Sequence, residues 1–388
     1  MEDHSPLTHA CLYSEFPLSY PGGGERLIKM IYDYLEEHGV ETQIIENINL
    51  RLDGVILSEK VIKIPSMRVY PEKFVRYGVP KILYQDLPMV DHMDSRPNYV
   101  SLIFLRRSPP KKILRELSQK GIKVIFCMHG IAIEKFRFAH PMIIAHQLLM
   151  RIQLRSLAKY SKGHIFVQTL TKQMKSYLVD HGADQNNVFL IENEFETPLL
   201  EVRRNDNSFN ILFIGRIENL SKGIRRLKKL CYLIAKNLPE VKINIVGSGK
   251  DSKILGKLPS NTLYLAKVDD DEKFRLIQSS NLGIITSNLE PFPLVFLEFL
   301  SSGLPVVTTP ASGPAYIASK DMEFGIISSF KEDVILQDIE KYYDMWREDK
   351  TGYFNLKKRI SSKARDMFKT EHMLELYKEK VINVSRRE

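Results

Sequence analysis

Short apolar runs alternate with amphipathic stretches along this chain, and that rhythm constrains the fold more than any other feature. Near the start, residues 25–35 carry apolar side chains at helical spacing, and the pattern stops before Gly39. Such alternation is typical of βαβ units, in which a helix connects one parallel strand to the next. The predicted strands are 10–13, 40–45, 123–128, 164–167, 187–191, 210–214 and 241–246. We therefore expect an α/β fold built on parallel sheets.

Two domains are expected, because 388 residues are more than one hydrophobic core usually serves. The polar stretch 197–208 lacks periodicity and predicts the linker between them. The predicted domains are residues 1–200 and 209–365. Residues 366–388 are charged and amphipathic, which predicts a closing C-terminal helix.

The net charge of +9 indicates an anionic partner, and nucleic acid, acidic lipid or a phosphorylated substrate would each satisfy it. No zinc-finger or RNP-type signature occurs, so nucleic acid is not expected. No run of about 18 apolar residues predicts a membrane span, and residues 1–6 lack a signal-peptide pattern. Cys11, Cys127 and Cys231 lie far apart in apolar stretches, which predicts buried free thiols. Together these features predict a cytoplasmic protein.

Glu290 and Glu298 form the most informative pair of residues in the second half. An apolar run at 282–286 precedes them, and Pro293 suits the first turn of a helix. One carboxylate would flank the helix N-terminus, and the other would lie about a turn and a half inside the helix. Free N–H groups at a helix N-terminus bind phosphate, and carboxylates accept hydrogen bonds from sugar hydroxyls. The arrangement suits a nucleotide-sugar.

A glycine turn at Gly215 follows the predicted strand 210–214, at the edge where open α/β sheets bind ligands. Arg216 could form a fork onto a diphosphate, and Lys222 could add a second positive charge. The alternative is a solvated basic loop that precedes a basic helix.

Gly247-Ser248-Gly249-Lys250 resembles half of a P-loop but lacks the upstream glycine, and Asp251 stands where Ser or Thr would bind magnesium. We expect a tight turn near a nucleotide. Asp269-Asp270-Asp271 contains an Asp-x-Asp metal spacing, yet it directly precedes an apolar-periodic run. Acidic residues in that position predict a helix N-cap and first turn, so no metal site is predicted.

Two features of the first half could face a ligand. Pro21-Gly22-Gly23-Gly24 precedes a helix and could bring backbone N–H groups to a phosphate, or it could be a simple turn. His129 ends the predicted strand 123–128, where a side chain faces the cleft of an open sheet, although most single histidines have no such role. Residues 141–159 are apolar with basic edges. They could lie on an anionic membrane surface or form a core-packing helix with a cationic rim.

Taken in order, these motifs resemble the retaining GT-B glycosyltransferases of family four, the glycosyltransferase-1 group. The resemblance covers nearly the whole chain and is most specific in the second half. The motifs that carry it are Gly-Gly-x-Glu-Arg (Gly22 to Arg26), His129-Gly130, Asn193, Gly-Arg…Lys-Gly (Gly215 to Gly223), Gly-x-Gly (Gly247 to Gly249), the Glu-x7-Glu pair, Gly-x-Pro-Val-Val (Gly303 to Val307) and the terminal segment 368–377.

The resemblance implies two Rossmann-like domains with parallel sheets facing across a cleft, the N-terminal one for the acceptor and the C-terminal one for the nucleotide-sugar. Arg216 and Lys222 would neutralise the leaving diphosphate in place of a metal. Glu290 would contact hydroxyls of the transferred sugar, and Glu298 the ribose. His129 would lie near the reacting carbon. The remaining implied donor contacts are Gly23 and Gly24 on the phosphate side, Gly215, Gly247, the backbone of Lys267 and Val268 against the base, and Phe292, Pro293, Leu294 and Val295.

The chain departs from the family pattern at three positions. Pro293 stands where many relatives have glycine, Glu194 where glycine usually follows the asparagine, and Phe299 where alanine is common. None of these removes a charge that the chemistry needs.

We therefore predict a metal-independent retaining hexosyltransferase that uses a UDP- or GDP-sugar. The expected acceptor is a glycan or a lipid-linked sugar at the cytoplasmic membrane face, with an anionic membrane surface as a candidate partner. No cofactor is expected, since the nucleotide-sugar is a co-substrate. The alternatives are a transferase with a soluble acceptor and a degenerate GT-B protein that binds without turnover.

Overall fold

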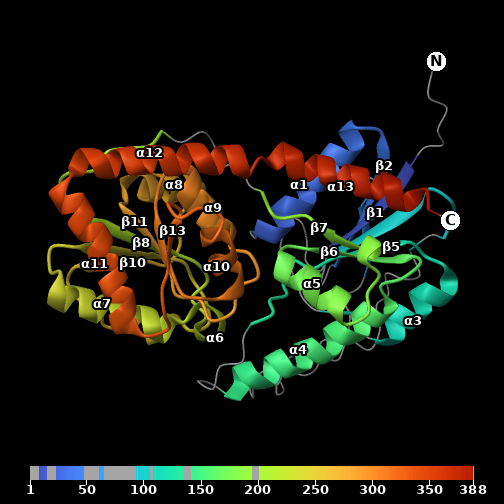
Figure 1. The fold of residues 1–388 in the computed structure, drawn as a ribbon, viewed down its shortest axis with the longest axis horizontal. Helices are drawn as coiled ribbons and strands as arrows, with labels where there is room; N and C mark the ends of the chain where they lie inside the picture. Colours follow the sequence, from blue (N-terminus) through green and yellow to red (C-terminus); the bar gives the residue numbers. More distant parts are fainter. Residues whose placement is uncertain are drawn as a thin grey trace. The chain divides into compact units, whose positions relative to one another are not determined.

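The computed structural model describes residues 8–14, 23–47, 61–64, 93, 95–104, 108–109, 111–134, 141–194 and 201–387 (Figure 1). The chain forms two compact units. The first unit comprises Met1–Glu192 together with Glu371–Glu388, and the second unit comprises Asn193–Thr370. The loop at Pro21-Gly22 lies outside the described residues.

The first unit is built on a parallel sheet that has seven strands among the described residues, in the order β3-β2-β1-β4-β5-β6-β7. The strand order reverses between β1 and β4. The strands are β1 (Thr8–Ser14), β2 (Val40–Asn47), β3 (Val61–Ile64), β4 (Tyr99–Phe104), β5 (Val124–Cys127), β6 (Ile165–Thr169) and β7 (Val188–Leu190). The helices are α1 (Gly23–Glu37), α3 (Lys111–Lys120), α4 (Pro141–Tyr160), α5 (Lys172–Asp180), η2 (Gln185–Asn187) and α13 (Thr370–Ser385).

Alternate residues of β1 supply the cores on the two faces of this sheet. Cys11 and Tyr13 join a buried cluster with residues of α3, α4 and α5. Ala10 and Leu12 join a second cluster with residues of α1 and α13. Successive strand side chains point to opposite faces, so one buried parallel strand needs apolar residues throughout. The last helix of the chain therefore packs beside the first one, and Tyr34 donates a hydrogen bond to Glu375 at 2.8 Å.

The second unit repeats this plan with a parallel sheet of six strands among the described residues, in the order β10-β9-β8-β11-β12-β13. The strands are β8 (Asn210–Ile214), β9 (Lys242–Val246), β10 (Thr262–Leu265), β11 (Leu282–Ile285), β12 (Val306–Thr308) and β13 (Gly325–Ile327). The helices are α6 (Asn219–Lys222), α7 (Ile224–Asn237), η3 (Ser252–Ile254), α8 (Asp270–Ser279), α9 (Leu294–Ser301), α10 (Ser312–Ala318), α11 (Glu332–Glu348) and α12 (Lys350–Met367). The prediction of two Rossmann-like parallel sheets is confirmed.

Several local predictions can be compared with the structure directly. The Asp269 carboxylate caps α8 by accepting the Glu272 N–H at 2.7 Å, which confirms the helix start. Cys11, Cys127 and Cys231 are buried and free, as predicted. The segment 366–388 contains a break, because α12 ends at Met367 in the second unit and α13 begins at Thr370. No helix in the described part of the chain is long and apolar enough to cross a membrane.

Candidate functional site

The candidate site lies at the carboxyl edge of the second sheet, where the strand order reverses. β8 and β11 are neighbours there, with Leu282 opposite Ile211. The loop after β8 leads into α6, and the loop after β11 leads into α9. Open α/β sheets bind ligands in the crevice beyond such a reversal.

A buried ion pair forms the centre of this site. The Lys222 ammonium, at the end of α6, contacts the Glu290 carboxylate in the loop before α9. Only 15% and 12% of these two side chains are exposed. Ser287 donates a further hydrogen bond to Glu290 at 3.4 Å. Residues that are 68 positions apart in the sequence are thus brought together.

Backbone contacts between the two loops hold this pair in place. The Asn288 and Leu289 N–H groups both donate to the Ser221 carbonyl, at 2.6 and 3.1 Å. The Asn288 side-chain amide donates to the carbonyls of Asn219 and Leu220, and the Thr286 hydroxyl donates to the Lys222 carbonyl at 2.8 Å. Carbonyls at the end of short α6 therefore find partners on the β11 loop instead of within a longer helix.

Gly223 and Arg226 complete the connection between the two loops. Gly223 has φ of +67°, and a Cβ there would lie 2.3 Å from the Thr286 carbonyl oxygen, so only glycine fits. Arg226 donates to the same oxygen at 2.8 Å and to the Asn288 side chain at 2.9 Å, with its guanidinium over the Phe330 ring. Arg226, in the basic helix α7, is therefore a structural cross-link to the loop after β11.

Gly313 of α10 supports Glu290 through the backbone. Its N–H donates to the Glu290 carbonyl at 2.9 Å. A Cβ on Gly313 would lie 2.5 Å from that oxygen and 2.3 Å from the Pro291 carbonyl oxygen. Sequence reasoning missed this residue. Its only local signal is a glycine near the start of a short helix.

The N-terminus of α9 borders the ion pair. Pro293 is the N-cap residue, one position before the predicted first turn, and the helix begins at Leu294. Phe292 and Pro293 are buried, whereas Leu294 and Val295 are half-buried. The unbonded N–H groups of a first helical turn carry partial positive charge and favour an anion.

Glu298 lies within α9 and is also paired. Its carboxylate contacts the Lys273 ammonium of α8 at 3.1 Å, and only 11% and 13% of these side chains are exposed. Lys273 also contacts Asp270 at 3.1 Å. Glu290, in the loop before α9, and Glu298, within α9, are thus each paired with a lysine.

Arg216 differs from Lys222 in being mostly exposed. Its side chain is 68% exposed and contacts Glu218 at 3.5 Å. Lys250 contacts the same carboxylate at 2.8 Å. Burial alone would raise the pKa of Glu218, but the Lys250 and Arg216 charges outweigh it, and the pKa is lowered. Arg216 is thus held loosely at the rim of the site.

The glycine turns after β8 and β9 pack against each other. A Cβ on Gly247 would lie 2.0 Å from the Gly215 carbonyl oxygen, and one on Gly215 would lie 3.8 Å from Lys222 Cε. Close backbone packing therefore accounts for Gly247. Lys267 is exposed and Val268 half-buried in the loop after β10, the edge strand.

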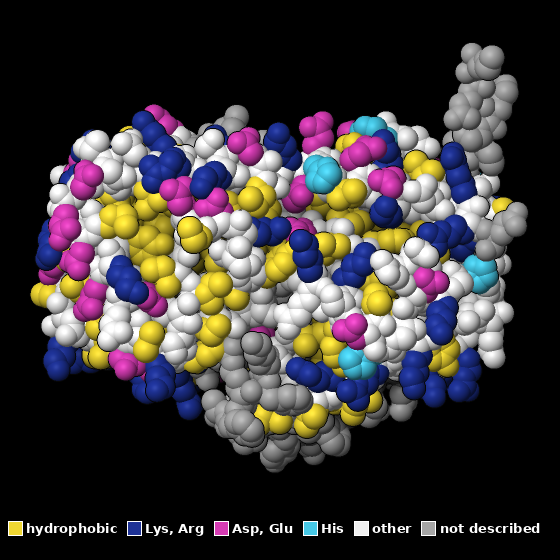
Figure 2. Space-filling model, in the orientation of Figure 1, with side chains coloured by type: hydrophobic (Ala, Val, Ile, Leu, Met, Phe, Trp, Pro, Cys, Tyr) yellow, Lys and Arg dark blue, Asp and Glu magenta, His cyan; other side chains and the backbone are white. Residues whose placement is uncertain are grey.

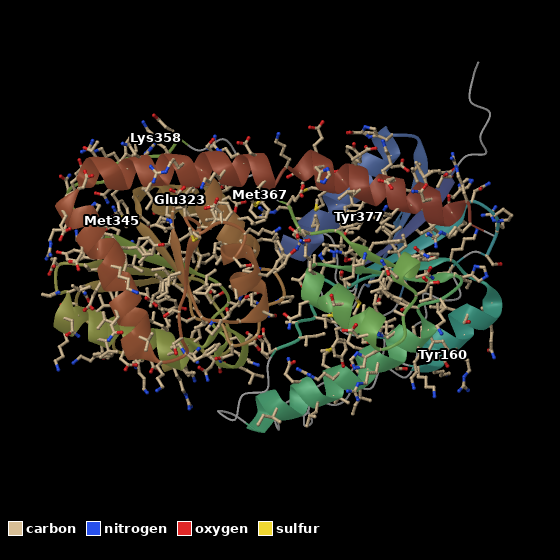
Figure 3. The ribbon with its side chains drawn as sticks, in the orientation of Figure 1. Tyr160, Glu323, Met345, Lys358, Met367 and Tyr377 are labelled. Atoms are coloured by element: carbon tan, nitrogen blue, oxygen red, sulfur yellow. The ribbon has the colours of Figure 1, made fainter. Side chains whose placement is uncertain are left out.

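The remaining predicted residues belong to the first unit. His129 follows β5, and its Nε2 lies 3.0 Å from the hydroxyl of Tyr377, with the Phe104 ring beside it. Figure 3 labels Tyr377 on α13. Burial lowers the pKa of His129 to about 4, so the ring is neutral at neutral pH. Gly23 begins α1, and a Cβ on Gly24 would meet no atom within 4 Å. Sequence reasoning missed Tyr377, which is 248 positions from its partner.

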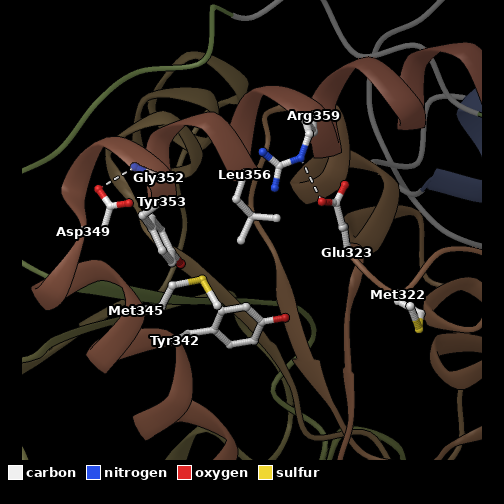
Figure 4. A pocket seen from close by; sticks show the side chains of 9 residues that line it. All are labelled: Met322, Glu323, Tyr342, Met345, Asp349, Gly352, Tyr353, Leu356 and Arg359. Carbon is white, nitrogen blue, oxygen red and sulfur yellow. Dashed lines mark hydrogen bonds and ion pairs between the residues drawn. The ribbon is translucent and has the colours of Figure 1, made fainter.

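A separate pocket of about 440 Å³ opens beside α11 and α12, and Figure 4 shows the Glu323–Arg359 ion pair at one side of it. It contains none of the predicted site residues. Its lining is Met322, Glu323, Tyr342, Met345, Asp349, Gly352, Tyr353, Leu356 and Arg359. Across the described ranges, no cluster of three or more His, Cys, Asp or Glu is placed to hold a metal ion.

Part of the second unit matches a family of known proteins. Residues 200–367, which contain the whole candidate site of the second unit, match the family model of the glycosyl transferases group 1. This part of the chain, less than half of its 388 residues, is similar to the group 1 glycosyltransferases. It is 30% identical over 115 residues to the sulfoquinovosyl transferase SQD2 of Arabidopsis thaliana. That match covers 29% of this chain and 22% of the relative, so the chain matches less than a quarter of the relative's length.

Solved structures show the fold. Sucrose-phosphate synthase from Thermosynechococcus elongatus aligns with a TM-score of 0.71 at 16% identity, over 96% of this chain and 98% of that one. Anabaena HepE in complex with UDP-glucose aligns with a TM-score of 0.66 at 15% identity, over 97% and 99%. The predicted GT-B fold is confirmed.

Proposed function

We propose that this protein is a metal-independent retaining glycosyltransferase that transfers a sugar from a UDP- or GDP-sugar to a glycan or lipid-linked acceptor at the cytoplasmic membrane face. The observation that carries the proposal is the buried Lys222–Glu290 pair at the sheet reversal, next to the N-terminus of α9. A cation, an anion and a helix N-terminus in one place match a diphosphate joined to a polyhydroxylated sugar. HepE, bound to UDP-glucose, supports a UDP-sugar as the first donor to test.

In this proposal, Lys222 and Glu290 neutralise each other until the donor binds. A diphosphate oxygen then takes the Lys222 ammonium, and a hydroxyl of the transferred sugar donates to Glu290. Arg216 swings in from the rim to add a second positive charge. Glu298 accepts from the ribose, beside the N–H groups of Leu294 and Val295. Such groups are already oriented before charge develops, which is the largest single contribution that a site of this kind can make.

The transfer itself needs no protein nucleophile. The acceptor oxygen attacks the anomeric carbon on the face that the diphosphate leaves. The bond between the anomeric carbon and the diphosphate oxygen breaks as the new glycosidic bond forms. The leaving phosphate oxygen takes the acceptor's proton, and the anomeric configuration is retained. His129, being neutral, acts as a hydrogen-bond partner near the reacting carbon. The backbone of Gly23 and Gly24 approaches the phosphates, and Gly215 and Gly247 allow the close turns beside them. The backbone of Lys267 and Val268 contacts the base. Phe292 and Pro293 shape the loop that leads into α9.

The first experiment is a thermal-shift panel of the purified chain against UDP, GDP, ADP and their sugars, with EDTA present. Selective stabilisation by one nucleotide supports a metal-independent donor site and names the base. Donor turnover is then compared for Glu290→Gln and Lys222→Met, each of which should lose at least about tenfold, or about 1.4 kcal/mol of transition-state stabilisation. Glu323→Gln is the matched control, because Glu323 is paired with Arg359 outside the site.

A double variant separates folding from catalysis. Either single substitution leaves one buried charge unpaired, which costs about 3–5 kcal/mol of stability. Lys222→Met combined with Glu290→Gln removes both charges and should recover most of that stability without recovering turnover. Full activity in the double variant, or the absence of any nucleotide-induced shift in a folded sample, contradicts the proposal.

A further inference from the structure

Positive charge is concentrated in one stretch of the first unit. Residues 101–180 contain fifteen Lys and Arg but three Asp and Glu, a net charge of +12. The whole chain carries +9, so the other residues are net negative together. A charge concentrated in one stretch of the chain favours an anionic partner for this part of the first unit.

The helix α4 lies within this stretch, and its two faces are distinct. Leu154, Leu157 and Ala158 are fully buried in the core cluster beneath the helix. Leu148 and Ile152, in contrast, are 48% and 62% exposed. The core is therefore complete without them, and they are not the core-packing residues of an ordinary amphipathic helix.

The exposed residues of α4 lie on one line. Leu148, Ile152, Arg155 and Lys159 follow at intervals of four, three and four, which places them on one side of the helix, and all four are exposed. Arg151 differs, because its guanidinium is used within the protein and donates to the Glu134 carbonyl at 2.8 Å. The line thus has an aliphatic half followed by a basic half.

The neighbouring helix α3 extends the basic half. Lys111 and Arg115 are exposed on it, while its opposite side packs in the same core cluster as α4. Figure 2 shows Lys and Arg side chains gathered over the region where Figure 1 has α3 and α4. We call Leu148, Ile152, Arg155 and Lys159, together with these two residues of α3, the α4 surface.

We propose that the α4 surface docks on an anionic lipid bilayer. Aliphatic side chains at an interfacial helix enter the boundary between headgroups and acyl chains, while each nearby Lys or Arg adds about 1 kcal/mol of attraction to acidic lipids. A nucleic acid would use the cations but would gain nothing from Leu148 and Ile152, since aliphatic side chains neither stack on bases nor bind phosphate. The inference deepens the proposed function by naming the surface that would bring the enzyme to a membrane-borne acceptor, although vesicle binding itself does not depend on catalysis.

The test is flotation of the full chain with vesicles of phosphatidylcholine mixed with phosphatidylglycerol, and with vesicles of phosphatidylcholine alone. We expect binding to the anionic vesicles only. The variant Leu148→Ser/Ile152→Ser and the variant Arg155→Gln/Lys159→Gln should each bind at least about tenfold more weakly. Matched controls in the second unit are Leu263→Ser/Met322→Ser, at positions that are 54% and 94% exposed, and Lys253→Gln/Lys358→Gln, and both should bind like the wild type.

Two results overturn the proposal. One is equal binding to neutral and anionic vesicles, and the other is wild-type binding by Leu148→Ser/Ile152→Ser. If only the basic variant loses affinity, and short RNA or DNA binds through the same residues, the surface is a nucleic-acid site instead. Nucleotide-induced thermal shifts without vesicles should be unchanged in all variants. A chain that floats but shows no such shift keeps this inference and loses the transferase proposal.

Discussion

Gly313→Ala is the substitution that tests most sharply how the candidate site is held. The change adds one carbon at the second position of α10. That carbon would lie 2.3 Å from the Pro291 carbonyl oxygen and 2.5 Å from the Glu290 carbonyl oxygen. Both neighbours are backbone atoms, which cannot turn aside as a flexible side chain can.

The size of the effect follows from these distances. An ordinary van der Waals separation is about 3.5 Å, so the segment at Glu290 and Pro291 must shift by about 1 Å. Overpacking of this kind costs about 1–3 kcal/mol, and the helix preference of alanine over glycine returns up to about 1 kcal/mol. We expect a net loss of about 1–2 kcal/mol, or a few degrees in Tm. A displacement of about 1 Å at a catalytic group can also lower turnover by about 10²-fold.

The assay combines thermal unfolding with initial rates of donor turnover per folded enzyme. Gly24→Ala is the stability control, because a Cβ there meets no atom within 4 Å and the residue also lies early in a helix. That variant should be as stable as the wild type or slightly more so. A Gly313→Ala protein with wild-type Tm would refute the packing argument. A lower Tm with unchanged turnover would refute the link between this contact and the position of Glu290.

Three further predictions concern buried groups. Tyr377→Phe removes the hydroxyl that lies 3.0 Å from His129. The variant should lose about 1 kcal/mol of stability, seen as a lower Tm, and should also show lower donor turnover. Unchanged turnover would contradict a role for this contact in the site. His129 has its folded pKa lowered from 6.5 to about 4, so the unfolded chain binds more protons between these values. The contribution of neutral His129 to the free energy of unfolding is therefore complete above pH 6.5 and is lost as pH falls towards 4, by at most about 3 kcal/mol for this half-buried ring. Denaturant midpoints should depend less on pH in His129→Gln than in the wild type. Lys357 is buried, its ammonium donates to the carbonyls of Arg203 and Ser280, and burial lowers its pKa from 10.5 to about 8. In chemical unfolding, the free energy of unfolding of the wild type should therefore rise by about 2 kcal/mol relative to that of Lys357→Met between pH 7 and 9.5, because the folded state loses its proton first. A stability difference between the two proteins that does not change with pH would contradict this.

Features set by short-range chemistry could be predicted from the sequence. The strand 210–214 coincides with β8, because an unbroken apolar run bounded by polar residues and glycine leaves little choice. Pro293 ends the loop before α9, and Asp269 caps α8, since each acts on its own backbone or on that of residues three positions away. The resemblance assigned Glu290 and Lys222 to one donor site, but their ion pair was not predicted, because no local pattern joins residues so far apart.

Other features were missed, most of them because they depend on contacts between distant segments. The central strand β4, Tyr99–Phe104, was missed although Tyr-Val-Ser-Leu-Ile-Phe is rich in strand-forming residues. Gly313 and Tyr377 had none, because their roles arise only when α10 meets the β11 loop and α13 meets β5. Asn288 likewise looks like any loop asparagine until α6 supplies carbonyls to its amide.

The hydrogen bonds around Lys222 and Glu290 are hard to explain by stability alone. A buried ion pair contributes little net stability, because taking two charges out of water offsets most of their attraction. Yet Asn288, Thr286 and Gly313 all hold the two loops that carry this pair. A protein that needed only a stable loop contact could use apolar side chains of the same volume. The cost is understandable if the two charges must already be separated and oriented when a charged ligand arrives, since preorganised groups need no further rearrangement as the reaction proceeds. Replacing both charges together should therefore leave the fold nearly as stable and remove the activity, which is the outcome that distinguishes a site kept for function from one kept for structure.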